Sequence, residues 1–206
     1  MKRRIKGLII MCSLLVFYTT MSAVAGEDNL ECIIENDEIL VREEITEEEF
    51  LKAVAEEKGI SYEEAQEYVA DEHAKNPMLN ARAPLYTIRY ETLTRTKNIG
   101  YGATLVARIK VEVITETTSG RRVGFGTIAT KHLTTGGEAT LYNYSGSINM
   151  RHPSQSIIYM DVLGEIYFDM VTTTEISGGG FVTVGTGVSG TTRYKYLVDT
   201  TFTFTP

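Results

Sequence analysis

Residues 105–113 read "LVARIKVEV", and this stretch decides the fold class. Five of its residues are apolar and occupy every second position, whereas three charged residues and one valine fill the positions between them. Successive side chains of a β-strand point to opposite faces of a sheet, so this period of two predicts a strand with one buried face. An α-helix would spread the same residues around its circumference. The apolar set comprises Leu105, Ala107, Ile109, Val111 and Val113.

The same period of two recurs from residue 85 to the end of the chain. The letters "TSGRR" at 118–122 predict a tight turn, and hence a hairpin with the strand that follows. A longer alternating run covers 157–174, where we predict a bulge or bend at Gly164. About seven strands with one apolar face each cannot form a single open sheet in water. Residues 85–206 are therefore predicted to form an antiparallel β-sandwich or barrel, and the strand spacing leaves that choice open.

Before this β domain the pattern becomes helical, in "ITEEEFLKAVAEEKGISYEEAQEYVADEHAKNP". Thr46 with Glu49, and Ser61 with Glu64, each match a capping box, in which two residues satisfy each other's backbone amides at a helix start. Gly59 follows a lysine and predicts a left-handed residue that ends the first helix. The segment is thus predicted to form two short helices joined by a brief turn, an αα-hairpin.

This helical hairpin, assigned to residues 45–76, is strongly acidic, as are the residues before it. Residues 26–76 carry 18 Asp and Glu against 4 Lys and Arg, whereas the rest of the chain after them carries 9 against 12. We predict a flexible acidic arm over 26–44 and a linker over 77–84. The turn between the helices resembles that of a helix-turn-helix DNA-binding motif, but residues 62–74 of the second helix, "YEEAQEYVADEHA", have five carboxylates and no Lys or Arg. Phosphate would repel such a helix, so nucleic acid is not the expected partner.

The first 25 residues have the three parts of a secretory signal peptide. Four basic residues precede an apolar run over 8–18, and Ala23 and Ala25 have the spacing of a cleavage site before Gly26. A membrane anchor is the alternative, but a span needs about 20 apolar residues and two threonines end this run early. We therefore predict cleavage between Ala25 and Gly26, export to the cell exterior, and no stable membrane span after the signal is removed.

Cleavage would leave one cysteine, Cys32, in the mature chain. A single cysteine excludes an intramolecular disulfide, so the fold is not a disulfide scaffold. An unpaired thiol is favoured over an intermolecular bridge.

Arg82, in the predicted linker, is a candidate processing point. Two interpretations of the acidic helices remain open: a removable pro-segment that covers the body, or a helical appendage in solvent.

Metal, cofactor and catalytic sites are not predicted. Asp161, Glu165 and Asp169 fall on one face of a strand, but residues four apart in a strand are roughly 13 Å apart, too far to share one Ca²⁺. The histidines lack the spacing of zinc ligands. Serines lie near the third histidine, yet no G-x-S-x-G motif occurs, so a hydrolase is only a third hypothesis. The histidines are His73, His132 and His152, and the serines are Ser145, Ser147, Ser154 and Ser156.

Residues 181–192, "FVTVGTGVSGTT", contain a literal G-x-G-x-x-G. A dinucleotide-binding loop requires a helix to begin at the third glycine, Gly190. The residues after Gly190 alternate as a strand does, so we interpret these glycines as bends and a turn between the last two strands.

The favoured function is a secreted, non-enzymatic β-sandwich protein that binds an extracellular protein or glycan, with exposed tyrosines available for recognition. The alternative is a secreted effector or toxin kept inactive by the acidic helices. Pore formation by the Thr-rich and Gly-rich strands is a minor alternative, because their lipid-facing side would be thin.

Overall fold

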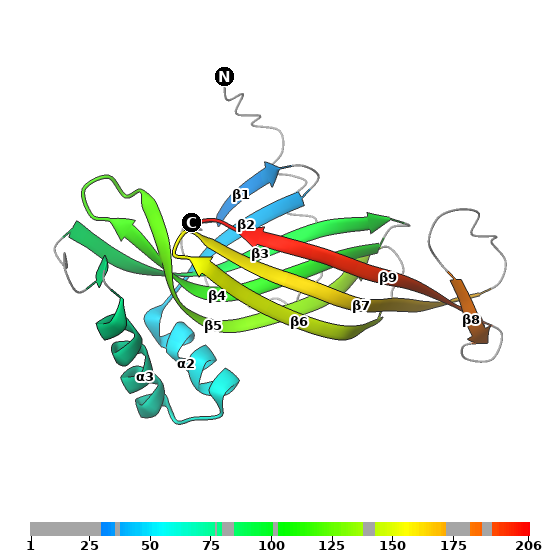
Figure 1. The fold of residues 1–206 in the computed structure, drawn as a ribbon, viewed down its shortest axis with the longest axis horizontal. Coiled ribbons are helices and arrows are strands. Elements are labelled where there is room, and N and C mark those ends of the chain that lie inside the picture. The colour runs from blue at the N-terminus through cyan, green and yellow to red at the C-terminus, as the bar shows by residue number, and fades with distance from the viewer. Residues whose placement is uncertain are drawn as a thin grey trace, which may run out of the picture.

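The computed structural model describes residues 30–35, 38–76, 78–79, 85–100, 103–137, 143–171, 182–186 and 191–206. These residues form two antiparallel sheets and two helices (Figure 1). The large sheet has the order β1-β2-β3-β4-β5, with β1 Leu30–Glu35, β2 Glu38–Ile45, β3 Tyr86–Gly100, β4 Ala103–Glu116 and β5 Arg122–Gly137. The small sheet has the order β6-β7-β9-β8, with β6 Asn143–Ser154, β7 Ile157–Val171, β8 Val182–Thr186 and β9 Thr191–Phe204.

The strands predicted after residue 85 are confirmed. Seven strands, β3 to β9, follow that residue, and the stretch that decided the fold class lies within β4. The predicted hairpin joins β4 to β5, and Gly120 in its turn has a φ of 66°, a left-handed conformation that favours glycine. The strand predicted after Gly190 is β9, which pairs with β8. Gly187 and Gly190 themselves lie outside the described residues.

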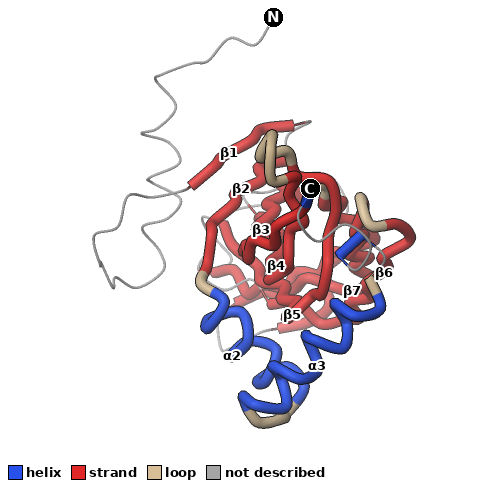
Figure 2. The backbone as a smooth tube through the Cα atoms, turned by 90° about the vertical axis from the view of Figure 1, so that its left-hand side faces the viewer, coloured by secondary structure: helices blue, strands red, loops and turns tan. Residues whose placement is uncertain are grey.

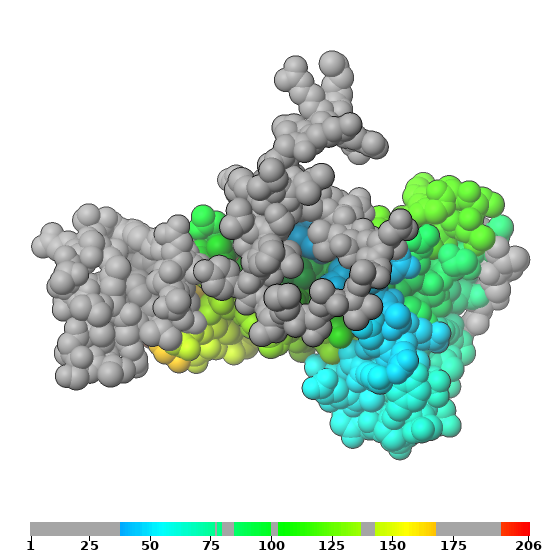
Figure 3. Space-filling view, turned by 180° about the vertical axis from the view of Figure 1, so that it is seen from behind, coloured from blue at the N-terminus to red at the C-terminus, as the bar shows by residue number. Residues whose placement is uncertain are grey.

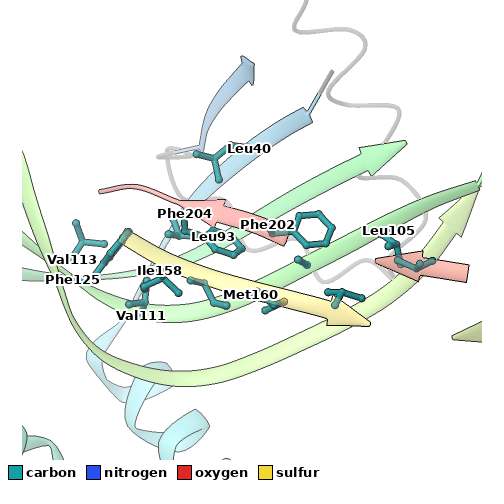
Figure 4. Packing of buried hydrophobic residues seen from close by; sticks show 14 of the residues in the cluster. Leu40, Leu93, Leu105, Val111, Val113, Phe125, Ile158, Met160, Phe202 and Phe204 are labelled. Carbon is teal, nitrogen blue, oxygen red and sulfur yellow. The ribbon is translucent and has the colours of Figure 1, made fainter. Parts of the chain in front are cut away.

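The apolar faces of the two sheets meet in one core (Figure 4). Every second residue of β4 from Ala103 to Val113 is buried, as the sequence period predicts. The small sheet contributes alternate residues of β7 and the aromatic end of β9. The largest fully buried side chains of this core are Phe125, Phe202, Phe204, Leu93, Leu105, Ile109, Ile158, Met160 and Ile166.

The prediction of a flexible arm over 26–44 is wrong where the structure describes those residues. β1 and β2 are strands of the large sheet, and β2 pairs with β3 from Glu38 to Ile45. Leu40 of β2 is buried in the core. Sequence reasoning missed this strand because Arg42, a charged residue, also lies buried, where an apolar residue would have continued the period. Its guanidinium is paired with the buried carboxylate of Glu91 at 3.2 Å.

Of the two alternatives predicted at Gly164, a bulge or a bend, the bulge is wrong. Gly164 pairs with Gly146 on β6 and with Val198 on β9, and neither register shifts there. A Cβ atom at Gly164 would lie 2.5 Å from the backbone oxygen of Ser145 and 2.9 Å from the ring of Tyr144. Glycine is therefore required by the close approach of a neighbouring strand and of an aromatic ring that packs against it.

Both helices begin and end where the sequence predicts. Helix α2 spans Glu47–Lys58 and helix α3 spans Tyr62–Lys75, and each has a complete capping box at its first turn. Gly59 ends α2 with a φ of 65°. We call α2 and α3 together the helical pair. Seen from the end of the molecule, the pair lies beside the large sheet (Figure 2), and it contacts β4 and β5.

The helical pair is docked on the body through an apolar cluster. The ring of Phe50, which is fully buried, packs against that of Tyr90 on β3 with the ring centroids 4.9 Å apart and the planes tilted by 36°. Ala129 of β5 completes the contact. Figure 3 shows the pair from the opposite side, standing out below the β body. The buried residues of the cluster are Phe50, Leu51, Ala53, Val54, Ala65, Val69 and Ala129.

Polar contacts join the two sheets along both margins. On one side the guanidinium of Arg42 donates to the backbone oxygen of Thr205 at 2.6 Å, and the ammonium of Lys97 donates to the hydroxyl of Thr200 at 2.9 Å. On the other side the amide of Phe125 donates to the backbone oxygen of Gln155 at 2.6 Å. β2 is therefore tied both to the large sheet and to the end of β9.

Several predictions fall on residues that the structure does not describe. These are the signal peptide over 1–25, its cleavage point at Ala25 and Gly26, most of the linker over 77–84, and Arg82. Within the described ranges, neither helix is long and apolar enough to cross a membrane.

Candidate functional site

A buried carboxylate lies on the outer face of the large sheet, beneath the helical pair. Glu112 of β4 is completely buried. Its Oε1 atom lies 2.7 Å from Nε2 of His73 on α3, and its Oε2 atom accepts a hydrogen bond from the amide of Thr127 at 2.8 Å. Gly126 leaves room for this arrangement, since a Cβ atom there would lie 2.6 Å from Oε2. The alternation "VEV" correctly placed Glu112 opposite the core, but a helix rather than water covers it.

His73 reaches Glu112 from the last turn of α3 and is 28% exposed. The hydrogen bond with Glu112 raises the pKa of His73, and the charges of Glu112 and Glu47 act in the same direction, whereas burial opposes them. An opposite charge within hydrogen-bond distance stabilises the protonated imidazole. The pair therefore joins a helix to a sheet through a charge-assisted hydrogen bond.

A pocket of about 250 Å³ opens beside this pair. His152 of β6 lines it, and its ring meets that of Phe125 edge-on at 6.4 Å. Burial lowers the pKa of His152, although a hydrogen bond with the backbone of Gln155 opposes the effect. The side-chain amide of Gln155 donates to Oδ1 of Asn76 at 2.9 Å, which bridges the end of α3 to the β6–β7 turn.

The structure brings two of the three histidines to this pocket and leaves the third elsewhere. His73 and His152 both line it, whereas His132 is an exposed residue of β5. Two histidines whose pKa values shift in opposite directions are a pattern found at acid–base sites. In the described part of the chain, the hydrogen bond that affects the pKa of His152 is the one with the backbone of Gln155. No three metal-ligating side chains converge among these described residues.

A second candidate is the outward face of the small sheet, which lies toward the viewer in Figure 1 and which neither of the described helices α2 and α3 covers. Leu163 of β7 is 61% exposed and Leu197 of β9 is 70% exposed. Leu163 pairs with Asp199, and Glu165 pairs with Leu197, so the two leucines are diagonal neighbours. We call this surface the open face. Its central residues are Tyr159, Asp161, Leu163 and Glu165 of β7 and Lys195, Leu197, Asp199 and Thr201 of β9.

Paired charges flank the two leucines. On one side the guanidinium of Arg151 donates to both carboxylate oxygens of Asp161, at 2.5 and 2.9 Å, and the hydroxyl of Thr201 donates to it at 2.8 Å. Arg151 and then Thr201 lower the pKa of Asp161 to about 2. On the other side Lys195 is paired with Glu165. The carboxylates of Asp161 and Glu165 thus contact different cations, and the side chain of Asp169 lies outside the description.

The comparisons identify no relative of this chain. No family model matches it, and neither a curated protein nor a solved structure matches it. The fold defines a class: a mainly β protein of two antiparallel sheets with two helices.

Sequence reasoning missed the site at Glu112, although one signal was present. Ala65, Val69 and His73 are four residues apart and so share one face of α3. Ala65 and Val69 are buried, and His73 continues their row. A histidine on the buried face of a helix needs a polar partner beneath it. Glu112, flanked by apolar residues on both sides in the sequence, was a candidate for that partner.

Proposed function

We propose that the protein is a secreted, non-enzymatic β-sandwich that binds another extracellular protein through its open face. Export rests on the signal peptide expected over 1–25. A sandwich is favoured over a barrel because the two sheets have separate strand orders and meet at their margins through a few hydrogen bonds rather than a continuous ladder.

The observation that carries the proposal is the exposure of Leu163 and Leu197 side by side. Single exposed apolar residues are common. Two large neighbours at the centre of a sheet face that no described helix covers, rimmed by paired charges, have the layout of a protein interface. Tyr159 adds an aromatic side chain, and the guanidinium of Arg151 lies 4.9 Å from its ring. Tyrosine and arginine are enriched among residues that dominate binding energy.

The charges of the open face favour a neutral protein as the occupant. Two cations, Arg151 and Lys195, lie among three carboxylates, Asp161, Glu165 and Asp199, and two of these carboxylates are already paired within the face. Such a surface has no excess positive charge for a nucleic acid or an anionic glycan. The centre of the face is apolar. The guanidinium of Arg151 already lies over the aromatic ring of Tyr159, where a sugar ring would otherwise stack. A protein with an apolar patch therefore fits this surface better than a sugar does.

The effector hypothesis, with a removable pro-segment, receives less support. Loss of everything before Arg82 would take β2 and its buried Leu40 and Arg42 from the sheet. The same loss would expose Ala129 and Glu112, which the helical pair now covers. Both effects make removal costly for the body that would remain.

Mass spectrometry of the protein from culture medium tests secretion and processing together. We expect one mature N-terminus, at Gly26. An additional terminus near Ala83 would favour the effector hypothesis, and retention of the first 25 residues in a cell-associated protein would contradict secretion.

Site-specific photo-crosslinking tests the open face. A photoreactive amino acid at Leu197, in the full secreted chain, should crosslink to one extracellular protein, which is then purified and titrated against the unlabelled chain. We expect Leu163→Asp to abolish this binding while the same photoreactive group at Glu57, exposed on α2, gives no crosslink. Crosslinking to a second copy of the chain, or binding only to glycans, would overturn the assignment of the partner.

A further inference from the structure

Helix α3 is attached to the body by two kinds of contact. Its first turns bury Ala65 and Val69 in the apolar cluster of the helical pair. Its C-terminal end is held by polar contacts, from His73 to Glu112 and from Asn76 to Gln155. Apolar contacts are insensitive to pH, whereas a histidine changes its charge close to neutral pH. The two ends of one helix therefore depend on pH differently.

The carboxylate of Glu112 depends on His73 for a positive charge. Glu112 is completely buried, and among the described residues its hydrogen-bond partners are the imidazole of His73 and the amide of Thr127. A buried carboxylate without a cationic partner is strongly destabilising. When His73 is neutral, Glu112 retains two hydrogen-bond donors but loses its counter-charge.

We propose that His73 and Glu112 form a pH-sensitive latch, which holds the C-terminal end of α3 over β4 and β5 when His73 is protonated and releases it as His73 becomes neutral. The latch is distinct from the open face, because it lies on the other sheet. Release would remove the wall that His73 contributes to the pocket, which His152, Thr127 and Gln155 also line.

The groups around His73 set the direction of the effect. Glu112 of β4 and Glu47 of α2 favour its protonated form and raise its pKa above the ordinary value of 6.5. On α3 itself, Glu72 and Lys75 are paired with each other at 2.7 Å. The latch therefore stabilises the docked helix fully below pH 6.5 and weakens as the pH rises through the higher pKa of the folded state.

Two neighbouring groups do not counteract this titration. Burial lowers the pKa of His152, so its imidazole is already neutral where His73 loses its proton. Tyr90 of β3 has its pKa raised, mainly by burial and then by Glu47 and Glu112, so its hydroxyl stays neutral throughout the range. His73 is thus the group among them whose charge changes near neutral pH.

Hydrogen exchange of the full secreted chain between about pH 5.5 and 8.5 tests the latch, because this range spans the ordinary titration of histidine. Protection factors, corrected for the intrinsic pH dependence of exchange, are compared for α3 residues 70–76 and for α2. We expect protection at 70–76 to fall about fivefold across the range, the ratio expected when a charge-assisted hydrogen bond becomes a neutral one. Protection in α2 should stay nearly constant.

Two variants and a control separate the latch from general unfolding. His73→Gln keeps a hydrogen-bond donor without a titrating charge and should make protection at 70–76 independent of pH. Glu112→Gln should do the same, and if that variant does not fold, His73→Gln decides the question alone. His132→Gln, at an exposed histidine, should retain the response of the unmodified protein. A flat profile in the unmodified protein, or a pH-dependent one in His73→Gln, would overturn the proposal.

Discussion

The outward faces of the two sheets begin from the same strand pattern and end in different environments. Glu112 on β4 and Asp161 on β7 each alternate with buried apolar residues, so each points away from the core. The helical pair covers Glu112 completely, whereas Asp161 lies on the open face. Glu112 therefore has a single histidine, His73, as its cationic partner. Asp161 is paired with Arg151 and is also partly exposed to solvent. The difference shows that a strand pattern defines which side is outward but not whether that side is exposed.

The largest expected effect comes from truncating matched leucines on the two faces. Leu51 lies in the cluster of the helical pair and is 3% exposed, whereas Leu197 on the open face is 70% exposed. Leu51→Ala should lower the free energy of unfolding by about 2–5 kcal/mol, because it leaves a cavity. Leu197→Ala should change it by no more than about 0.5 kcal/mol. Urea denaturation followed by circular dichroism measures both.

A comparable loss in both variants would mean that the open face is covered by something in solution. A small effect of Leu51→Ala would instead mean that the helical pair is weakly docked.

A smaller effect is expected from filling the space beside Glu112. The Cβ atom of Gly126→Ala would lie 2.6 Å from Oε2 and must displace the carboxylate, which also disturbs its bond with Thr127. We expect a loss of about 1–3 kcal/mol, typical of overpacking. Gly136→Ala is the matched control on β5, because its Cβ atom meets only the hydroxyl of Thr104, at 3.0 Å.

Thermal unfolding of these two variants makes the comparison. If Gly126→Ala were as stable as Gly136→Ala, the fit of Glu112 under the helices would be looser than the structure indicates.

The smallest effect is expected from a change to the carboxylate of Asp161 on the open face. The pKa of Asp161 is about 2 rather than 3.8, chiefly because Arg151 and Thr201 donate to its ionised form. A lowered pKa means that the stabilisation is present above the ordinary value and is lost as the pH falls through about 2. Asp161→Asn should therefore leave stability at neutral pH little changed, since exposed ion pairs contribute little.

Carboxyl NMR titration tests this assignment directly. We expect Arg151→Ala to return the pKa of Asp161 toward 3.8. A low pKa that persisted in this variant would show that Arg151 is not its main cause.

Local features were predictable to within a residue, and longer-range ones were not. The capping boxes at Thr46 and Ser61 predicted both helix starts correctly, because each box involves two residues that are only three positions apart in the sequence. β2 was missed because its inward-facing Arg42 is buried as the partner of Glu91, and no local sequence pattern reveals a pair 49 residues apart. Gly164 was correctly singled out, but its reason is the close approach of β6 rather than a bulge.

By itself, the sequence determined where both helices begin, which residues of β4 face the core, and where the hairpin between β4 and β5 turns. Each of these depends on side chains a few residues apart, whose sterics and hydrogen bonds act within one element. The tertiary structure alone decided which outward face is covered and which carboxylate is buried. His73 and Glu112 are 39 residues apart, and Arg42 and Glu91 are 49 apart. Such pairs form only when packing of the apolar surfaces brings distant elements together and makes an unpaired charge too costly to leave.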